Sequence, residues 1–290
     1  MKDLSLTSVE VVKMLCRRYR FRPQTAAGQN FLVDKNVLEN IVVAADLKPG
    51  EPVLEIGAGF GTLTQALAKG GAQVTAVELD RRLFASLEKT LAGYKNVNLV
   101  KGDIFEQWPA LSHQFQDRQY KLISNLPYGI TSLVLRRFLE QLPRPSQLAV
   151  MVQKEVAERV TADPSKMSLL SVAVQLQAKA QICRVVPAAS FWPVPEIDSA
   201  ILKLDLLAES TKTVELKKEQ KEVKKIIGLA KIGFSSRRKQ LANNLSGGLG
   251  MERENIKNLL KKMGISEKIR AQDISISQWR QLAEEIYKKI

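Results

Sequence analysis

The stretch from Pro52 to Gly61, PVLEIGAGFG, decides the fold of this 290-residue chain. Its apolar first half predicts a buried strand, and its glycine-rich second half predicts a tight turn that opens a helix at Thr62. Glycines let the backbone turn sharply and approach a ligand closely. A dinucleotide fold favours the spacing G-x-G-x-x-G, whereas the spacing here is G-x-G-x-G after an acid. The stretch therefore predicts a cofactor-binding turn, with an NAD enzyme as the alternative.

Short apolar runs alternate with amphipathic segments from Pro52 to Asp205. This alternation predicts an α/β fold with a doubly wound, mostly parallel sheet. After Leu207 the strand signal ends, and the predicted elements are the helices Lys217–Gly233, Arg237–Leu245, Glu252–Met263 and Ser277–Lys289. We therefore predict an N-terminal helical arm at 1–27, a cofactor-binding domain at 28–207 and a small, basic, all-helical RNA-binding domain at 208–290.

Two carboxylates follow the next predicted strands. Glu78 ends the strand that begins at Gln73, about twenty residues after the glycines, where an acid accepts hydrogen bonds from ribose hydroxyls. Asp103 follows the third strand, where it is placed to accept a bond from an adenine amine. Each acid on its own is also an ordinary helix N-cap or turn residue. The two together, following a glycine turn, favour a nucleoside site.

The tetrapeptide Asn125-Leu126-Pro127-Tyr128 ends a further short apolar run. Open α/β sheets place their ligands at the carboxyl ends of strands. An amide that accepts an exocyclic N–H and a ring that stacks on a base suit a nucleobase, although Asn-x-Pro is also common turn chemistry. We predict that this tetrapeptide holds the substrate base.

The chain is strongly basic, with a net charge of +14. From Lys212 onward there are 19 Lys/Arg against 9 Asp/Glu, so most of the surplus lies in the last quarter. This asymmetry favours a nucleic-acid partner over a membrane, because no strongly apolar helix face accompanies it. Arg237, Arg238 and Lys239 are the predicted phosphate contacts; a solvated helix surface is the alternative.

Other residues argue against several classes of protein. Cys16 and Cys183 lie far apart and His113 is the single histidine, so neither a metal site nor a His-dependent triad is expected. No apolar run is long enough to span a membrane, and no signal-peptide pattern is present. We expect a cytoplasmic monomer with reduced thiols.

The glycine loop resembles the S-adenosylmethionine-binding turn of class I methyltransferases. The motif set as a whole resembles one family, the small-subunit ribosomal RNA adenine dimethyltransferases (KsgA type), from about Gly28 to the C-terminus. The resemblance rests on GQNFL at 28–32, the glycine loop, Asn125–Tyr128, FWPVP at 191–195 with Ser199, and FSSRRK at 234–239 with the NNL at 243–245. One departure is Pro23–Ala27, where the family usually carries basic residues; Arg17, Arg18, Arg20 and Arg22 lie slightly upstream.

This resemblance implies a class I methyltransferase fold and S-adenosylmethionine as the methyl donor. Asn30, Leu32 and Gly57 would contact the methionine end of the donor, with Glu78 on its ribose and Asp103 on its adenine, and Gly59 would also belong to the donor site. Asn125 would lie between donor and substrate, and Tyr128 and Phe191 would pack against the target base. Ordinary core packing is the alternative for both rings.

The implied reaction is dimethylation of two adjacent adenosines near the 3′ end of 16S rRNA during small-subunit biogenesis. If the Asn125 side-chain oxygen and a Leu126 or Pro127 carbonyl accept the two amine protons, the nitrogen lone pair points at the methyl group. Two further functions remain open: a large-subunit rRNA adenine methyltransferase of the antibiotic-resistance type, and an RNA-binding ribosome-assembly factor.

Overall fold

The computed structural model describes residues 5–24, 28–116, 118–207 and 213–288. Its contacts separate two compact units, Met1–Ala157 with Gln181–Leu206, and Glu158–Ala180 with Leu207–Ile290. The second unit groups residues 158–180 with the C-terminal helices, whereas the sequence places them in the range 28–207. The functional division into arm, cofactor domain and RNA-binding domain stays a prediction.

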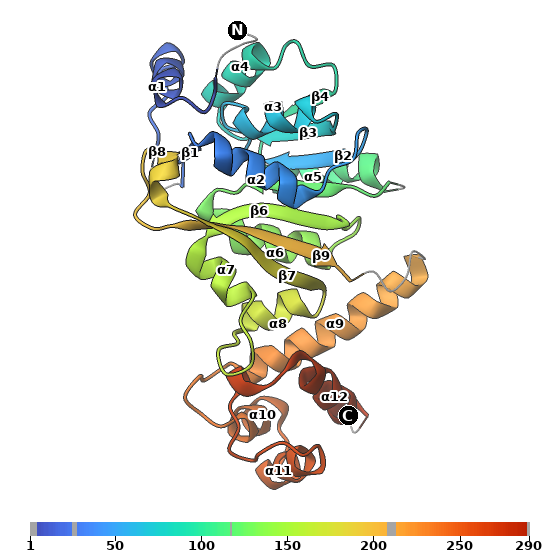
Figure 1. Ribbon diagram of the computed structural model, residues 1–290. Coiled ribbons are helices and arrows are strands. Elements are labelled where there is room, and N and C mark those ends of the chain that lie inside the picture. The colour runs from blue at the N-terminus through green and yellow to red at the C-terminus, as the bar shows by residue number, and fades with distance from the viewer. Residues whose placement is uncertain (1–4, 25–27, 117, 208–212, 289–290) are drawn as a thin grey trace. The chain divides into compact units, whose positions relative to one another are not determined.

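A seven-stranded sheet forms the centre of the first unit, in the order β4-β3-β2-β5-β6-β9-β7 (Figure 1). The pairs β2–β3, β3–β4, β2–β5 and β5–β6 are parallel, and β6–β9 is antiparallel. This arrangement confirms the predicted mostly parallel α/β fold. The strands are β2 (Pro52–Ile56), β3 (Gln73–Glu78), β4 (Val97–Lys101), β5 (Lys121–Asn125), β6 (Gln147–Gln153), β7 (Ala178–Val186) and β9 (Ser199–Leu206).

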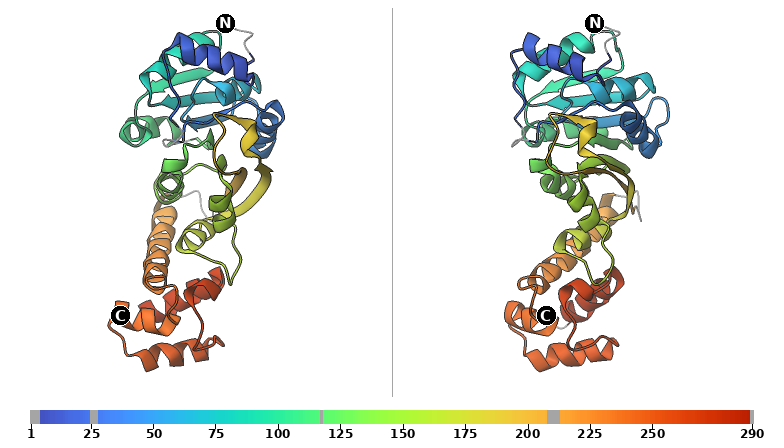
Figure 2. Two further views of the ribbon diagram at one scale, coloured as in Figure 1. Left: turned by 90° about the vertical axis from the view of Figure 1, so that its left-hand side faces the viewer. Right: turned by 60° about the vertical axis from the view of Figure 1, so that its left-hand side comes forward.

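Helices cover both faces of this sheet (Figure 2). Their buried apolar side chains recur at helical spacing, as Val37, Ile41 and Ala45 do in α2 (Lys35–Ala45). On the same face lie α3 (Thr62–Lys69) and α4 (Arg81–Thr90), which join one core cluster with α2. The opposite face carries α5 (Ile104–Leu111) and α6 (Thr131–Glu140), whose Trp108 and Phe138 meet edge-on, with ring centroids 4.7 Å apart.

A second, two-stranded sheet joins β1 (Phe31–Leu32) to β8 (Phe191–Trp192), with Phe31 opposite Trp192. The sequence did not predict it, because two residues are too few to show strand periodicity. It connects two motifs that are far apart in the chain. Before it, α1 (Val9–Arg18) begins at the N-cap Ser8, whose hydroxyl accepts the Val11 N–H.

The second unit is helical in its described part, apart from the start of β7. Its helices pack around the fully buried Trp279 and include α8 (Leu169–Gln175), α9 (Thr213–Gly233), α10 (Leu241–Leu249), α11 (Arg253–Lys262) and α12 (Ile276–Tyr287). The short α7 (Lys154–Val160) crosses the boundary between the units. Among the described residues, no helix is long and apolar enough to cross a membrane.

One predicted helix begins later than the sequence indicated. The range Arg237–Leu245 was predicted to be helical, but α10 starts at Leu241 and the three basic residues lie in the preceding turn. The cause is a tertiary contact: the buried Asn244 side chain donates hydrogen bonds to the Gly233 and Ser236 carbonyls. The Asn244 amide thereby pairs carbonyl groups that the break between α9 and α10 leaves without helical hydrogen-bond partners.

Candidate active site

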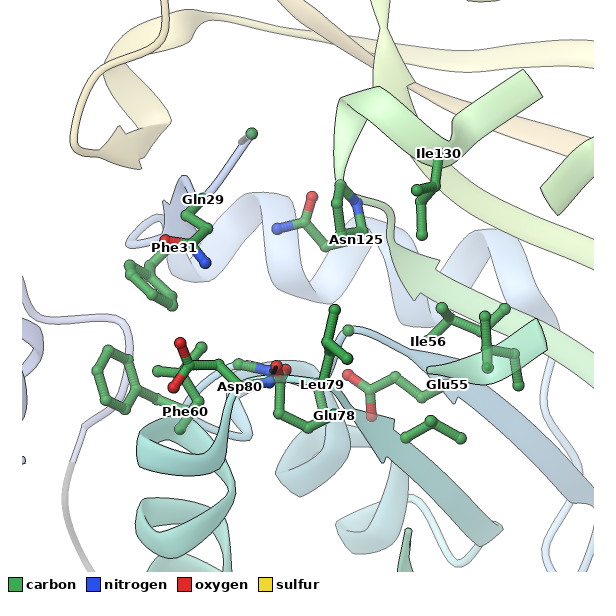
Figure 3. A pocket seen from close by; sticks show the side chains of 18 of the residues that line it. Gln29, Phe31, Glu55, Ile56, Phe60, Glu78, Leu79, Asp80, Asn125 and Ile130 are labelled. Atoms are coloured by element: carbon green, nitrogen blue, oxygen red, sulfur yellow. Dashed lines mark hydrogen bonds between the residues drawn. The ribbon is translucent and has the colours of Figure 1, made fainter. Parts of the chain in front are cut away.

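A cavity of about 740 Å³ opens at the carboxyl ends of β2, β3 and β5. This is the edge at which parallel α/β sheets bind ligands. Figure 3 shows Asn125 and Ile130 on one side of the cavity and Glu55 and Glu78 on the other. The predicted site residues that line it are Asn30, Leu32, Gly57, Gly59, Glu78, Asp103, Asn125 and Pro127. One cavity thus collects side chains from five segments of the chain.

The glycine loop joins β2 to α3 and forms the floor of the cavity. Gly57 has a φ of +74°, and a Cβ there would lie 3.2 Å from the Pro127 ring. Both observations require glycine, because an L side chain would be strained and crowded. The loop backbone therefore approaches the Asn125–Tyr128 tetrapeptide more closely than any other residue would permit.

Glu78 is buried and holds the glycine loop in place. One carboxylate oxygen accepts the Gly59 N–H at 2.8 Å, and the other accepts the Asp80 N–H at 2.8 Å. Burial raises the pKa of this carboxyl above its usual range, while the two backbone N–H groups act in the opposite direction. Each oxygen retains a second acceptor position, so the carboxylate can still receive hydroxyl donors.

Asp103 is the N-cap of α5, and its carboxylate accepts the Phe105 N–H at 2.8 Å. The same side chain lines the cavity. The capping alternative that the sequence left open is therefore realised, and it is compatible with a ligand contact because only Oδ1 is engaged.

Asn125 ends β5 and turns its side chain into the cavity (Figure 3). Its amide nitrogen donates to the Asn30 carbonyl oxygen at 3.4 Å. In the described part of the chain its Oδ1 accepts no hydrogen bond. The bond to Asn30 orients the amide, which leaves this oxygen as a free acceptor in the site.

Gly28 brings the GQNFL segment against the tetrapeptide. Its φ is +71°, and a Cβ at Gly28 would lie 2.8 Å from the Tyr128 backbone nitrogen. Two residues further on, Asn30 is 8% exposed, and its buried Oδ1 has no hydrogen-bond partner in the described part of the chain. Buried polar atoms are normally paired, so an orphaned acceptor in a cavity indicates a donor supplied by a ligand.

Glu55 is a site residue that the sequence reasoning noted only as the acid before the glycines. It is 2% exposed, lines the cavity, and its Oε2 has no partner among the described residues. Burial, with a smaller contribution from the Glu78 charge, raises the pKa of Glu55 to about 8. The sequence does contain a signal for Glu55, because a carboxylate within an apolar strand is costly to bury unless a partner or ligand compensates it.

Three predicted catalytic residues do not line the cavity. Leu126 and Phe191 are each 1% exposed, and Phe191 belongs to the core cluster of the sheet rather than to an open loop. Tyr128 is half-buried, and its hydroxyl lies 2.7 Å from the Ser199 Oγ. Phe191 therefore packs in the core, and the contact of either ring with a base stays a prediction.

Arg237, Arg238 and Lys239 belong to the second compact unit and are exposed. Their position in a turn leaves all three side chains open to solvent. The contact of these side chains with RNA phosphates stays a prediction. Among the described residues no cluster of three or more His, Cys, Asp or Glu could hold a metal ion.

The sheet order, the glycine turn and the acids at the next two strand ends define a class I S-adenosylmethionine-dependent methyltransferase. The family model for ribosomal RNA adenine dimethylase matches residues 20–288, and the chain belongs to this family. A ribosomal RNA small subunit methyltransferase A from Dehalococcoides mccartyi (strain CBDB1) is 41% identical over 93% of this chain and 90% of its own.

Two solved structures share the fold. A dimethyladenosine transferase from Plasmodium falciparum is 26% identical, with a TM-score of 0.71 over 89% of this chain and 98% of its own. The 23S rRNA methyltransferase ErmE is 28% identical, with a TM-score of 0.68 over 89% of this chain and its full length. The alternative interpretation of the chain as an NAD enzyme is excluded, because the family consists of methyltransferases.

Proposed function

We propose that the chain transfers methyl groups from S-adenosylmethionine to the exocyclic amines of two adjacent adenosines near the 3′ end of small-subunit rRNA, giving dimethyladenosines. The observation that carries the chemistry is the free Oδ1 of Asn125, held beside the glycine loop by the bond to Asn30. The choice of small-subunit rRNA as the substrate is supported by relatives 34–41% identical that bear the name ribosomal RNA small subunit methyltransferase A.

The cavity residues fit the methyl donor. The orphaned oxygens of Asn30 and Glu55 are acceptors that suit its ammonium group, which is a three-fold donor. Glu78 has lone pairs left for the ribose, and Asp103 for the adenine amine. Leu79, 65% exposed beside Glu78, offers an apolar surface to the adenine ring. When bound, this donor supplies a methyl group on a positively charged sulfur.

The protein's own contribution is positioning. An adenine amine is a poor nucleophile because its lone pair is delocalised into the ring. Asn125 Oδ1 accepts a hydrogen bond from one amine N–H, and the Leu126 or Pro127 backbone carbonyl accepts one from the other. Pro127 lines the cavity, and its carbonyl keeps a second lone pair beside the bond from the Ile130 N–H at 3.1 Å. Two acceptors draw the nitrogen towards tetrahedral geometry and aim its lone pair at the methyl group.

Tyr128 follows these acceptors and stacks on the target base, which flips out of its RNA stack to reach the site. Stacking on one aromatic ring is worth about 1–3 kcal/mol. Because the Tyr128 hydroxyl meets Ser199, its ring is anchored at one end. The exposed Arg237, Arg238 and Lys239 bind the phosphates of the same rRNA. We propose that the enzyme works as a cytoplasmic monomer.

The deciding experiment is methyl transfer from labelled S-adenosylmethionine to immature small subunits and, separately, to large subunits, followed by nucleoside analysis. We expect dimethyladenosine in the small subunit alone; label in the large subunit alone would favour the resistance-type activity. Asn125→Ala should abolish methylation and leave donor binding within about threefold, since oxyanion-type contacts are worth about 10²–10³ in rate. Asn98→Ala, at an exposed site in β4, is the control, and an active Asn125→Ala enzyme would contradict the mechanism.

A further inference from the structure

A second hollow lies along α1 and the turn that follows it. This α1 groove has a volume of about 790 Å³, and its lining includes Lys13, Arg17, Arg20, Arg22, Phe21 and Trp192. All four basic side chains are exposed, and none of the described residues that line the groove is acidic. Among the described residues, neither Arg17, Arg20 nor Arg22 forms an ion pair with a carboxylate. The groove therefore presents a surplus of positive charge, which the nearby Glu10 reduces at Lys13.

The backbone at the end of α1, which carries these cations, has an unusual conformation. Arg20 has a φ of +51°, the left-handed conformation that helices reserve for a glycine beyond their last turn. Around it, the Phe21 N–H bonds to the Cys16 carbonyl at 2.8 Å and the Arg20 N–H bonds to the Arg17 carbonyl at 3.2 Å. This chain places arginine where glycine is favoured. The reversal brings arginines from the helix and from the turn to one groove.

Trp192 supplies an aromatic wall. The Lys13 ammonium lies 5.7 Å from its ring centroid, and the ring is partly exposed. The other two tryptophans, Trp108 and Trp279, are 3% and 0% exposed. A cationic groove with an accessible aromatic ring is the combination that binds single-stranded nucleic acid, because phosphates meet the charges and a base stacks on the ring.

Residues that line the groove pack against residues that line the cofactor cavity. Trp192 pairs with Phe31 in the two-stranded sheet, and Phe31 lines the cavity. Phe21 packs edge-on against Phe31 with ring centroids 5.8 Å apart, and the Arg82 guanidinium, from the cavity wall, lies 5.0 Å from the Phe21 centroid. All of these residues belong to the first compact unit.

We propose that the α1 groove binds the sugar-phosphate backbone of the single-stranded RNA that flanks the target adenosine, with one flanking base stacked on Trp192. This inference rests on the proposed function for the identity of the RNA. Because residues of the groove pack against residues of the cavity, a strand held here lies near the site where its adenine is methylated.

The test uses the full chain and a labelled single-stranded RNA 12-mer with one central adenosine. Arg17→Gln with Arg20→Gly removes two charges, and glycine suits the backbone at position 20, so the double variant should fold at least as well. We expect RNA affinity to fall on the order of tenfold, and the slope of log affinity against log salt to drop by about 1.4. Donor binding should not change.

The matched control is Lys89→Gln with Lys95→Gln, which removes two exposed charges of the same unit that line neither cavity. If the control loses as much affinity and slope as the groove variant, the effect is net charge and the proposal is overturned. An unchanged affinity of the groove variant for the RNA, while the wild type methylates immature small subunits, also overturns the proposal and leaves the proposed function intact. If the wild type does not methylate immature small subunits, the proposed function itself is contradicted.

Tryptophan fluorescence tests the stacking separately. Addition of the RNA should quench the emission of the partly exposed Trp192, and Trp192→Phe should abolish that quench while retaining most of the affinity. Trp192→Ala should weaken binding of the single strand by more than that of an equally long duplex, whose bases are not free to stack. Equal losses for strand and duplex, or no quench in the wild type, would exclude a stacked base.

Discussion

The side-chain amide of Asn125 donates a hydrogen bond to the Asn30 carbonyl oxygen over 3.4 Å, joining residues 95 positions apart. This bond sets which end of the amide faces the site. The nitrogen is engaged with the protein, so the oxygen is free to accept a hydrogen bond from an adenine amine. The GQNFL segment therefore orients the Asn125 amide.

Gly28→Ala should separate catalysis from donor binding. A Cβ at Gly28 would lie 2.8 Å from the Tyr128 nitrogen at a φ of +71°, so the Asn125–Tyr128 backbone must shift. Because a misplacement of about 1 Å can cost on the order of 10²-fold in rate, we expect kcat to fall by that order and donor affinity to change little. Gly129→Ala, with open space around its Cβ position, is the control. Equal activities of the two variants would contradict this account.

Glu78→Ala should damage both the loop and the donor site. The variant leaves the Gly59 and Asp80 N–H groups without their carboxylate acceptor, at a cost of about 1–3 kcal/mol for each group left buried and unpaired. We expect a lower thermal midpoint and a loss of donor affinity of at least tenfold, measured by calorimetry. Glu88→Ala, an exposed residue of α4, should change neither quantity. Unaltered donor affinity in Glu78→Ala would exclude a ribose contact.

Glu55 should make the stability of the donor-free protein fall as pH rises. The ordinary pKa is 4.5 and the folded-state pKa is about 8, so between these values the folded protein binds a proton that the unfolded chain has released. Stability from this group is complete below about pH 4.5 and is lost progressively up to about pH 8. Glu55→Gln should remove this slope and be more stable than wild type at pH 9, by up to about 5 kcal/mol. Thermal midpoints from pH 5 to 9 provide the check; parallel curves would mean that Glu55 titrates normally.

Binding of S-adenosylmethionine should favour the ionised form of Glu55 over the protonated form. An ammonium beside the orphaned Glu55 oxygen favours the ionised carboxylate, so affinity for S-adenosylmethionine should rise with pH up to about 8. Calorimetry in buffers of different ionisation enthalpy should detect the release of a proton on binding. In Glu55→Gln the affinity should be weaker and independent of pH over this range. A pH-independent wild type would place the ammonium elsewhere.

Arg237→Gln with Arg238→Gln should weaken RNA binding with little effect on folding, because both side chains are exposed. Two lost phosphate contacts should lower the salt slope by about 1.4 on single-stranded RNA or about 1.8 on a duplex. Lys261→Gln with Lys268→Gln, also exposed in the second unit, removes the same charge elsewhere. Identical salt slopes in wild type and the Arg237/Arg238 variant would mean that this turn is an ordinary solvated surface.

Much of the cofactor half of the site could be predicted from local pattern. The glycine turn follows β2, Glu78 ends β3 and Asp103 follows β4, so each lies at a strand end that periodicity alone identifies. Because the carboxyl ends of parallel strands share one edge of a sheet, their convergence follows from the fold class. The surplus of Lys and Arg over Asp and Glu in the last quarter of the chain likewise follows from the composition alone.

Other features depended on contacts between distant segments. The pairing of Phe31 with Trp192, the burial of Phe191 and the turn at Arg237 each result from packing or hydrogen bonds that no local periodicity encodes. The Glu55 charge state is another such feature, since the raised pKa comes from burial inside the folded unit.

By itself, then, the sequence determined the class of fold, the donor loop and the acids around it, because these are short-range patterns repeated along the strands. Tertiary structure alone decided that Asn30 orients Asn125, that Glu55 Oε2 has no partner among the described residues and that Trp192 lies beside the arginines of α1. The physical reason is that hydrogen-bond partners, desolvation and cavities exist only between surfaces that folding brings together.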